Sequence, residues 1–474
     1  MIVLYVSAFY YRKKVDGFLS KLRERIRGYY TGEGVTSGEI LTILLPVMID
    51  QFFLVSFNFI NTAMISSSGQ EAVSAVNMIG SLNIFLVQIF GAIGLGGTVL
   101  IARTFGERAF DKLGKLCAAV IHSTFFVGTL IMVLFLVLHQ PLLALLFGSA
   151  DDLVMHQARL YFIGILCSYP AHSIIEGING SLRGIGKTKD SLKNSLVMNS
   201  LYLLSNFIFV IVLQKGISGL IISLLISRYL TLIIASVNLY RHHTDFNLKR
   251  DNILNISPQV DRIVLTTAVP FAAEYIFFNG GKIIMQMMIV SLGTTYIAAN
   301  AISVSWIQLA EIIPSALSTA LVPIIGQAVG RKSLSDIKKM TKTFVGTGIA
   351  AFIIVNLIML PLFPVAMNLF NAPSDLVPLI FKIYLITLTM HILCWSTSFV
   401  LPATLRAVGD GAFTTKVSLT TMWLFRVGVG YIVGIKLGYG LIGLFTIMTL
   451  EWALRSLIFI WRFRSGKWQA KIMS

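Results

Sequence analysis

The sequence predicts an all-α integral membrane protein in which twelve transmembrane helices form two six-helix lobes. Three observations support this: the composition is strongly apolar, twelve apolar runs are long enough to cross a bilayer, and the second half of the chain repeats the first. Of the 474 residues, 56% are hydrophobic and only 12% are charged, whereas about 25% of the residues of a soluble domain are charged. The composition therefore excludes a soluble enzyme, a disordered chain and a secreted protein held by disulfides.

The apolar runs define the organisation of the chain. A bilayer core about 30 Å thick requires about 20 apolar helical residues to cross it. Such runs cover residues 40–65, 77–102, 116–138, 157–180, 192–213, 217–240, 262–291, 300–328, 343–363, 378–400, 413–435 and 440–462. We therefore expect an N-terminal segment at 1–38, an N-lobe at 39–240, an inter-lobe linker at 241–261, a C-lobe at 262–463 and a tail at 464–474.

The distribution of basic residues predicts the orientation in the membrane. Of the 38 Lys and Arg residues, 30 fall on the side of both termini, whereas the opposite loops carry only Lys215 and Lys436. Because cytoplasmic loops are rich in Lys and Arg, we expect both termini to be cytoplasmic, in the inner membrane of a bacterium. This placement accounts for the net charge of +17 without a nucleic-acid partner.

The N-terminal segment and the linker are the two parts that do not span the membrane. Residues 1–11 are apolar but too short to cross, and basic residues follow them. A signal peptide carries its charges first, so we expect a basic segment lying on the cytoplasmic membrane surface. His242 and His243 in the linker are interpreted as part of a solvated loop, because no further His or Cys completes a metal site.

An internal repeat at a spacing of 223 or 224 residues divides the chain into two halves. Matching positions include Pro46 with Pro270, Asp50 with Glu274, and the segment 182–186 with 405–409. Because each half has an even number of spans, both halves enter the membrane in the same orientation. The sequence therefore predicts a pseudo-twofold axis along the membrane normal and a central cavity between the lobes.

Over residues 38–463 the chain resembles the multidrug and toxic compound extrusion (MATE) family, close to its NorM-like bacterial branch. The resemblance rests on several short segments taken together: 45–51, 182–188, 270–274, 293–301, 325–330 and 405–410. It implies a secondary antiporter that exports amphipathic organic cations in exchange for inward Na⁺ or H⁺. It implies no other cofactor and no enzymatic activity; we expect a monomer surrounded by lipid.

The chain departs from the family at positions linked to ion coupling. Many members carry an Asp late in helix 1 and another in helix 5, and the matching positions here are Asn61 and Asn206. Asparagine can donate and accept hydrogen bonds but cannot titrate, so a coupling role does not transfer to these two residues unchanged. The Na⁺-coupled members also use an acidic residue in helix 10, where this chain has only His391.

Two carboxylates are the leading candidates for ion coupling or substrate contact. Asp50 and Glu274 lie near the middle of helices 1 and 7, each one turn after a helix-bending proline, Pro46 or Pro270. A charge at the bilayer centre costs about 2.5–3.5 kcal/mol on insertion scales. A carboxylate beside carbonyls freed by proline suits a transient Na⁺ or a proton, although a neutral, hydrogen-bonded acid in the lobe core is the alternative.

The other ionisable residues in the spans allow both structural and functional interpretations. Glu311, Lys282 and Arg426 could form a charge network with Glu274, and Glu451 and Arg455 are spaced as an intrahelical ion pair. Arg228 is expected to hold the N-lobe together. Glu176 either lines the cytoplasmic mouth or is structural, and His391 is either a proton relay or a hydrogen-bonded core residue.

Two further expectations concern the division of labour between the lobes. We expect Asp50, surrounded by neutral Asn58, Asn61 and Asn206, to carry the coupling ion, while Glu274 holds or gates the C-lobe. We expect Arg183 and Arg406 to shape cytoplasmic turns, because a glycine follows each by three residues.

Two other functions stay open from the sequence. A flippase for lipid-linked or anionic amphiphiles is favoured by the membrane cations Arg228 and Arg426. An intramembrane enzyme is disfavoured, because the seven histidines are scattered and no Gly-x-Ser-x-Gly or His-Glu-x-x-His motif occurs.

Overall fold

The computed structural model describes residue 24 and residues 28–65, 70–147 and 151–473, and in these residues it contains helices and no strand. The N-lobe consists of α2 (Ser37–Ile65), α3 (Gln70–Gly106), α4 (Phe110–Phe147), α5 (Asp152–Gly184), α6 (Thr188–Asn206) continued by η2 (Phe207–Val212), and α7 (Gly216–Arg241). Two short helices, α8 (His243–Phe246) and α9 (Arg250–Leu254), occupy the linker. Asn61 belongs to α2, but its side chain lies outside the described part.

The C-lobe repeats this order of helices. Three single helices come first: α10 (Pro258–Ser291), α11 (Thr294–Gly330) and α12 (Leu334–Leu369). The tenth span consists of α13 (Val377–Met390), η3 (His391–Trp395), α14 (Ser396–Phe399) and α15 (Leu401–Ala407). The eleventh consists of α16 (Gly411–Thr420), η4 (Thr421–Val429) and η5 (Ile432–Lys436), and the last is α17 (Gly440–Arg464). After it come η6 (Lys467–Gln469) and α18 (Ala470–Met473). Most of these helices are longer than the sequence predicts; α12, for example, has 36 residues.

The length and composition of the helices confirm a polytopic membrane protein. Eleven helices in the described part of the chain are long and apolar enough to cross a membrane. The twelfth, α5, has 33 residues and is less apolar, since it contains His172, Glu176 and Arg183. It packs against α3, α4 and α7, so these polar side chains lie inside the N-lobe. The twelve-helix, two-lobe prediction is confirmed.

The backbone itself repeats between the two halves. Residues with positive φ angles recur in pairs 223 or 224 positions apart: Arg108 with Lys332, Gly186 with Gly409, Gln214 with Gly438, and Gly216 with Gly440. Positive φ is uncommon outside glycine, so four such coincidences show that the same turns connect equivalent helices. A π-helical segment also ends the fifth span, η2, and the eleventh, η5, at matching positions.

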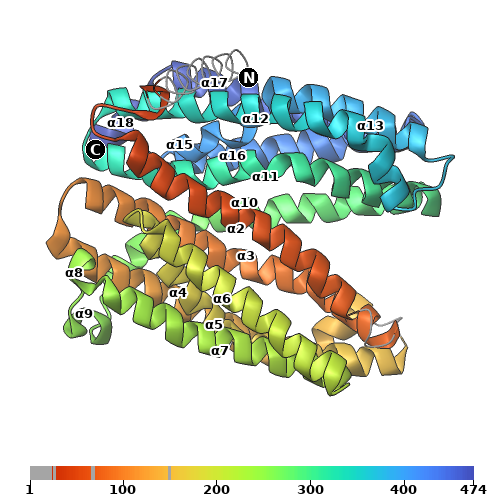
Figure 1. The fold of residues 1–474 in the computed structure, drawn as a ribbon, viewed down its shortest axis with the longest axis horizontal. Helices are drawn as coiled ribbons and strands as arrows, with labels where there is room; N and C mark the ends of the chain where they lie inside the picture. Colours follow the sequence, from red (N-terminus) through yellow and green to blue (C-terminus); the bar gives the residue numbers. More distant parts are fainter. Residues whose placement is uncertain (1–23, 25–27, 66–69, 148–150, 474) are drawn as a thin grey trace, which may run out of the picture.

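The two lobes lie side by side as separate bundles, with α2 running obliquely between them (Figure 1). The linker helices α8 and α9 and the C-terminal α18 lie at the same end of the molecule, at the left in Figure 1. We call this the linker end. The turns that begin at Gly186 and Gly409 belong to the same end, because an even number of spans separates each from the linker.

Two glycines hold the lobes together at the linker end. A Cβ atom added at Gly106, at the end of α3, would lie 2.2 Å from the carbonyl oxygen of Gln327 in α11. One added at Gly330, at the end of α11, would lie 2.1 Å from the carbonyl oxygen of Arg103 in α3. Gly106 and Gly330 are repeat mates, as are Arg103 and Gln327. Each helix therefore contacts the other through equivalent residues, as a twofold axis between α3 and α11 requires.

The residues just before α2 are attached to the C-lobe. The backbone amides of Glu33 and Gly34 donate to the carboxylate of Asp336 at 2.7 and 3.0 Å, and Tyr30 shares a hydrogen bond with Thr347. Asp336 is 1% exposed at the start of α12. The chain therefore contacts the C-lobe before it enters the N-lobe. The rest of the expected surface segment, residues 1–23 and 25–27, lies outside the described residues.

We predict that Gly106→Ala destabilises the protein by about 1–3 kcal/mol, because a methyl group at this crossing overlaps a backbone carbonyl that cannot rotate away. Gly91→Ala, on the same helix, is the matched control, since nothing lies within 4 Å of a Cβ at that position. Thermal unfolding of the two purified variants is the measurement. Equal melting temperatures would contradict the close crossing.

Candidate functional site

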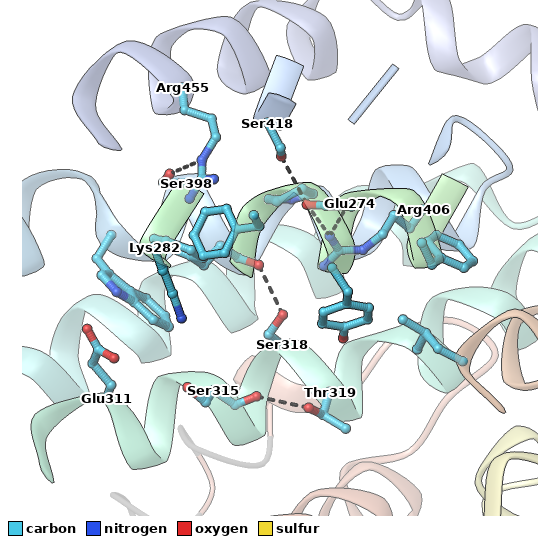
Figure 2. A pocket seen from close by; sticks show the side chains of 17 residues that line it. Glu274, Lys282, Glu311, Ser315, Ser318, Thr319, Ser398, Arg406, Ser418 and Arg455 are labelled. Carbon is cyan, nitrogen blue, oxygen red and sulfur yellow. Dashed lines mark hydrogen bonds and ion pairs between the residues drawn. The ribbon is translucent and has the colours of Figure 1, made fainter. Parts of the chain in front are cut away.

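A polar cavity of about 380 Å³ lies in the C-lobe and reaches the N-lobe at Leu95. Glu274, near the midpoint of α10, projects into it and meets Arg406 from the end of α15, with Nη1 at 3.4 Å from Oε2. Ser418 of α16 donates a hydrogen bond to the same carboxylate at 3.0 Å. Figure 2 shows Arg406 and Ser418 converging on Glu274 from two different helices. This carboxylate therefore has fixed partners.

A second cavity, of about 620 Å³, adjoins the first and is mainly aromatic and apolar. Five residues line both cavities: Phe278, Lys282, Glu311, Trp395 and Phe399. The second cavity also contains methionine, glutamine and asparagine side chains, which can adapt to ligands of different shape. Together the two cavities offer carboxylates, cations and aromatic faces to one ligand.

His391 is held rigidly beside this site. Its ring is stacked between Phe352, at 4.4 Å, and Trp452, at 5.5 Å between ring centroids. Its Nε2 lies 3.2 Å from Oε1 of Glu311, and its side chain is only 2% exposed. The pair joins η3 of the tenth span to α11.

A buried ion triad borders the cavities. Glu451 of α17 accepts from Arg426 of η4 at 2.5 Å and lies 3.7 Å from Nη1 of Arg455, one turn along its own helix. Thr421 donates to Oε1, the oxygen that Arg455 approaches, at 2.8 Å. The intrahelical pair expected from the sequence is therefore present, and Arg426 joins it. Arg426 therefore pairs with Glu451 and not, as in the expected charge network, with Glu274.

Asp50 occupies a different environment in the N-lobe. It borders a small cavity of about 20 Å³ that is also lined by Arg183, Thr188, Ser191 and Thr319. Its Oδ1 is buried and has no hydrogen-bond partner in the structure. A space of this size holds about one water molecule or ion. The polar neighbours are three hydroxyl groups, the amide of Gln51 and one arginine. The expected Asn206 is not among them, because it lies about 22 Å beyond Ser191 along α6.

The carbonyl that Pro46 frees is already occupied. Proline removes the donor for the carbonyl four residues earlier, here that of Thr42. Thr188 donates to the carbonyls of Thr42 and Ile43, each at 3.1 Å. In the C-lobe, Thr415 donates to the carbonyl of Pro270 itself at 2.9 Å. The carbonyl freed by Pro46 therefore takes part in the packing of α2 against α6.

Arg183 and Arg406 do more than shape turns. The turns are present, with Gly186 and Gly409 at φ of 83° and 91°. However, Arg183 lines the Asp50 cavity and lies 3.6 Å from Glu176, while Arg406 lines the Glu274 cavity. Each arginine thus faces the carboxylate of the first helix of its own lobe. The repeat of both residue types at one spacing was the sequence signal for this.

The remaining N-lobe candidates are in contact with one another or with buried hydroxyl groups. Glu176 lies between Arg183 and His172, whose Nε2 is 4.0 Å away. Arg228 is 6% exposed and donates to Ser168 across the lobe. Asn206 is fully buried. In the described part of the chain no three His, Cys, Asp or Glu side chains are grouped closely enough to hold a metal ion.

We predict that Glu451→Gln lowers the stability by about 3–5 kcal/mol, because it leaves two buried arginines without their carboxylate. Glu107→Gln is the control, since Glu107 forms an ion pair with Arg103 in which both side chains are more than a third exposed. Such exposed pairs contribute at most about 1 kcal/mol. Thermal unfolding of the purified chain measures both; similar losses would show that the triad does not hold the C-lobe together.

Comparison with known proteins gives the family. A family model described as MatE matches residues 46–210 and 270–432. The chain is 23% identical to the uncharacterized transporter YisQ of Bacillus subtilis, over 92% of this chain and 96% of that protein. It is 21% identical to the probable multidrug resistance protein NorM of Oceanobacillus iheyensis, over 83% of this chain and 88% of that one.

Solved structures agree on the fold. A MATE structure in the bent conformation has a TM-score of 0.83 at 16% identity and covers 92% of this chain and 97% of its own. A transporter of the MOP superfamily from Pyrococcus furiosus, reported with a binding pocket of reverse polarity, has a TM-score of 0.80 at 16% identity, covering 92% and 96%. The repeated lobes, the paired carboxylates and the matched family model lead to one conclusion: the chain belongs to the multidrug and toxic compound extrusion (MATE) family of membrane transporters.

Proposed function

We propose that this protein is a secondary antiporter that exports amphipathic organic cations in exchange for inward Na⁺ or H⁺. The observation that carries the proposal is the pair of adjoining C-lobe cavities, which place the carboxylates Glu274 and Glu311 beside an aromatic wall. A positive group is attracted by the carboxylates, and aromatic faces add cation–π attraction. The name of the NorM relative, a probable multidrug resistance protein, supports the same type of cargo.

Alternating access follows from how the lobes meet. The first cavity is bordered by α3 of the N-lobe as well as by the C-lobe, while the Gly106–Gly330 crossing joins the lobes at the linker end. Separation of this crossing would open the cavity toward the linker end. If the basic loops are cytoplasmic, the structure has its cytoplasmic side closed. The protein then works as a monomer, with its many exposed apolar side chains against lipid.

Asp50 is the proposed carrier of the coupling ion. Its Oδ1 has no hydrogen-bond partner, and the adjoining space holds one ion or water. Glu274, by contrast, is held by Arg406 and Ser418. A carboxylate with one unpaired oxygen can take up and release a cation during the cycle. On this proposal protonation or Na⁺ binding at Asp50 weakens its attraction for Arg183, and Glu274 holds the C-lobe.

We predict that Asp50→Asn uncouples export from the ion gradient, whereas Glu274→Gln reduces the rate but retains coupling. The measurement is efflux of a fluorescent organic cation from vesicles under an imposed Na⁺ or pH gradient, which also identifies the ion. Glu107→Gln is the control for expression and insertion. If Asp50→Asn still couples a gradient to export while Glu274→Gln does not, the roles of the two lobes are reversed.

A further inference from the structure

Three cations surround one aromatic ring at the junction of the two C-lobe cavities. The centroid of the Phe278 ring lies 5.1 Å from Nζ of Lys282, 5.4 Å from Cζ of Arg426 and 5.8 Å from Cζ of Arg455. Among the described residues Glu451 is the one carboxylate within 4.0 Å of this group, and it lies between the two arginines. Three cationic side chains therefore share one close carboxylate, and Glu311 acts on Lys282 only from a greater distance.

The hydrogen-bonding capacity of the cluster is also incompletely used. Arg426 and Arg455 are 4% and 2% exposed, yet Nε of Arg426 and Nη2 of Arg455 have no hydrogen-bond partner. Lys282 has no carboxylate within 4.0 Å among the described residues, because Glu311 pairs instead with His391. Burying a hydrogen-bond donor without an acceptor costs free energy. A cation inside a membrane-spanning segment normally pairs with an acidic group or a carbonyl oxygen.

The side chains of the cluster line the cavities. Lys282 lines both cavities, Arg455 lines the polar one and Arg426 lines the aromatic one. Figure 2 shows Lys282 and Arg455 on the same side of the cavity, away from the Glu274–Arg406 pair. The cluster thus lies where a ligand that fills the aromatic cavity would place a polar end.

The backbone shared by the two lobes does not dictate these cations. Their repeat mates in the N-lobe are neutral: Lys282 corresponds to Asn58, Arg426 to Tyr202 and Arg455 to Thr231. The N-lobe has the same helix order and the same turns without them. A packing role in the shared fold therefore does not explain why three cations are gathered here.

We propose that Lys282, Arg426 and Arg455 form a subsite for the acidic group of the substrate, a carboxylate or a phosphate, whose apolar body occupies the aromatic cavity. The inference rests on the proposed function, and it specifies the cargo: zwitterionic amphipaths whose acidic group binds here and whose positive end lies toward Glu274 or Glu311. Simple organic monocations lack a group for this subsite. Lys282 is the residue that determines specificity, because the other two cations share Glu451.

The test measures equilibrium binding to the full-length chain in detergent, without any ion gradient. Three fluorescent amphipaths share one aromatic body and differ in a single group: a carboxylate, a primary amide or a quaternary ammonium. We expect the carboxylate probe to bind at least about tenfold more tightly than the amide probe, as a charge-assisted hydrogen bond in a dry site predicts. Lys282→Gln removes this preference, and Lys282→Arg retains most of it.

Lys436→Gln is the matched control, because Lys436 also lies over an aromatic ring, Tyr431, but on the exposed end of η5. It should leave the preference unchanged. Unchanged melting temperatures of the Lys282 variants verify that they are folded. A carboxylate probe that binds no more tightly than the amide, or a preference that survives Lys282→Gln, overturns the subsite.

Failure of the subsite is distinguishable from failure of the antiport proposal. If efflux of an organic cation is driven by an ion gradient but the carboxylate probe has no advantage, the subsite is wrong and the antiport stands. If the carboxylate preference depends on Lys282 but no gradient drives efflux, the subsite stands and the antiport proposal is wrong.

Discussion

The absence of water from the bilayer core governs the interior of this protein. A charge there is costly unless a partner or a water-filled cavity receives it. The chain nevertheless gathers ionisable groups in the middle of both lobes, and it distributes them differently. In the C-lobe, Glu451 lies between two arginines, Glu274 faces Arg406 and Glu311 faces His391. In the N-lobe, Asp50 has an unpaired oxygen beside hydroxyl groups.

The unequal lobes are built on an equal backbone. Positive φ angles, π-helical segments and the glycine crossing all recur at the repeat spacing. The shared backbone explains why Arg183 and Arg406 both face the first helix of their lobe. The difference lies in side chains that the backbone does not dictate, such as Lys282 opposite Asn58. One lobe thus acquired a charged, aromatic cavity, and the other kept a small hydroxyl-lined one.

The two lobes can move only where their contact allows it. At the linker end, backbone meets backbone through Gly106 and Gly330, and Gln327 donates to the carbonyl of Gly184 at 3.1 Å. The contact between the lobes extends beyond these two glycines, because α3 also packs against α10 and α11 packs against α2. The cavities belong mainly to the C-lobe and reach the N-lobe at Leu95.

The sequence by itself determined the helix number, the repeat, the family and the position of the carboxylates along their helices, because hydrophobic length and spacing are one-dimensional properties. It also predicted the Glu451–Arg455 pair, since four residues make one helical turn. Only the tertiary structure assigned Arg426 to Glu451, Arg406 to Glu274 and His391 to Glu311, because each pair joins different helices. The rotation of each helix about its axis decides these partners, and packing against neighbouring helices sets that rotation. For the same reason the unpaired donors around Phe278 became visible only in three dimensions.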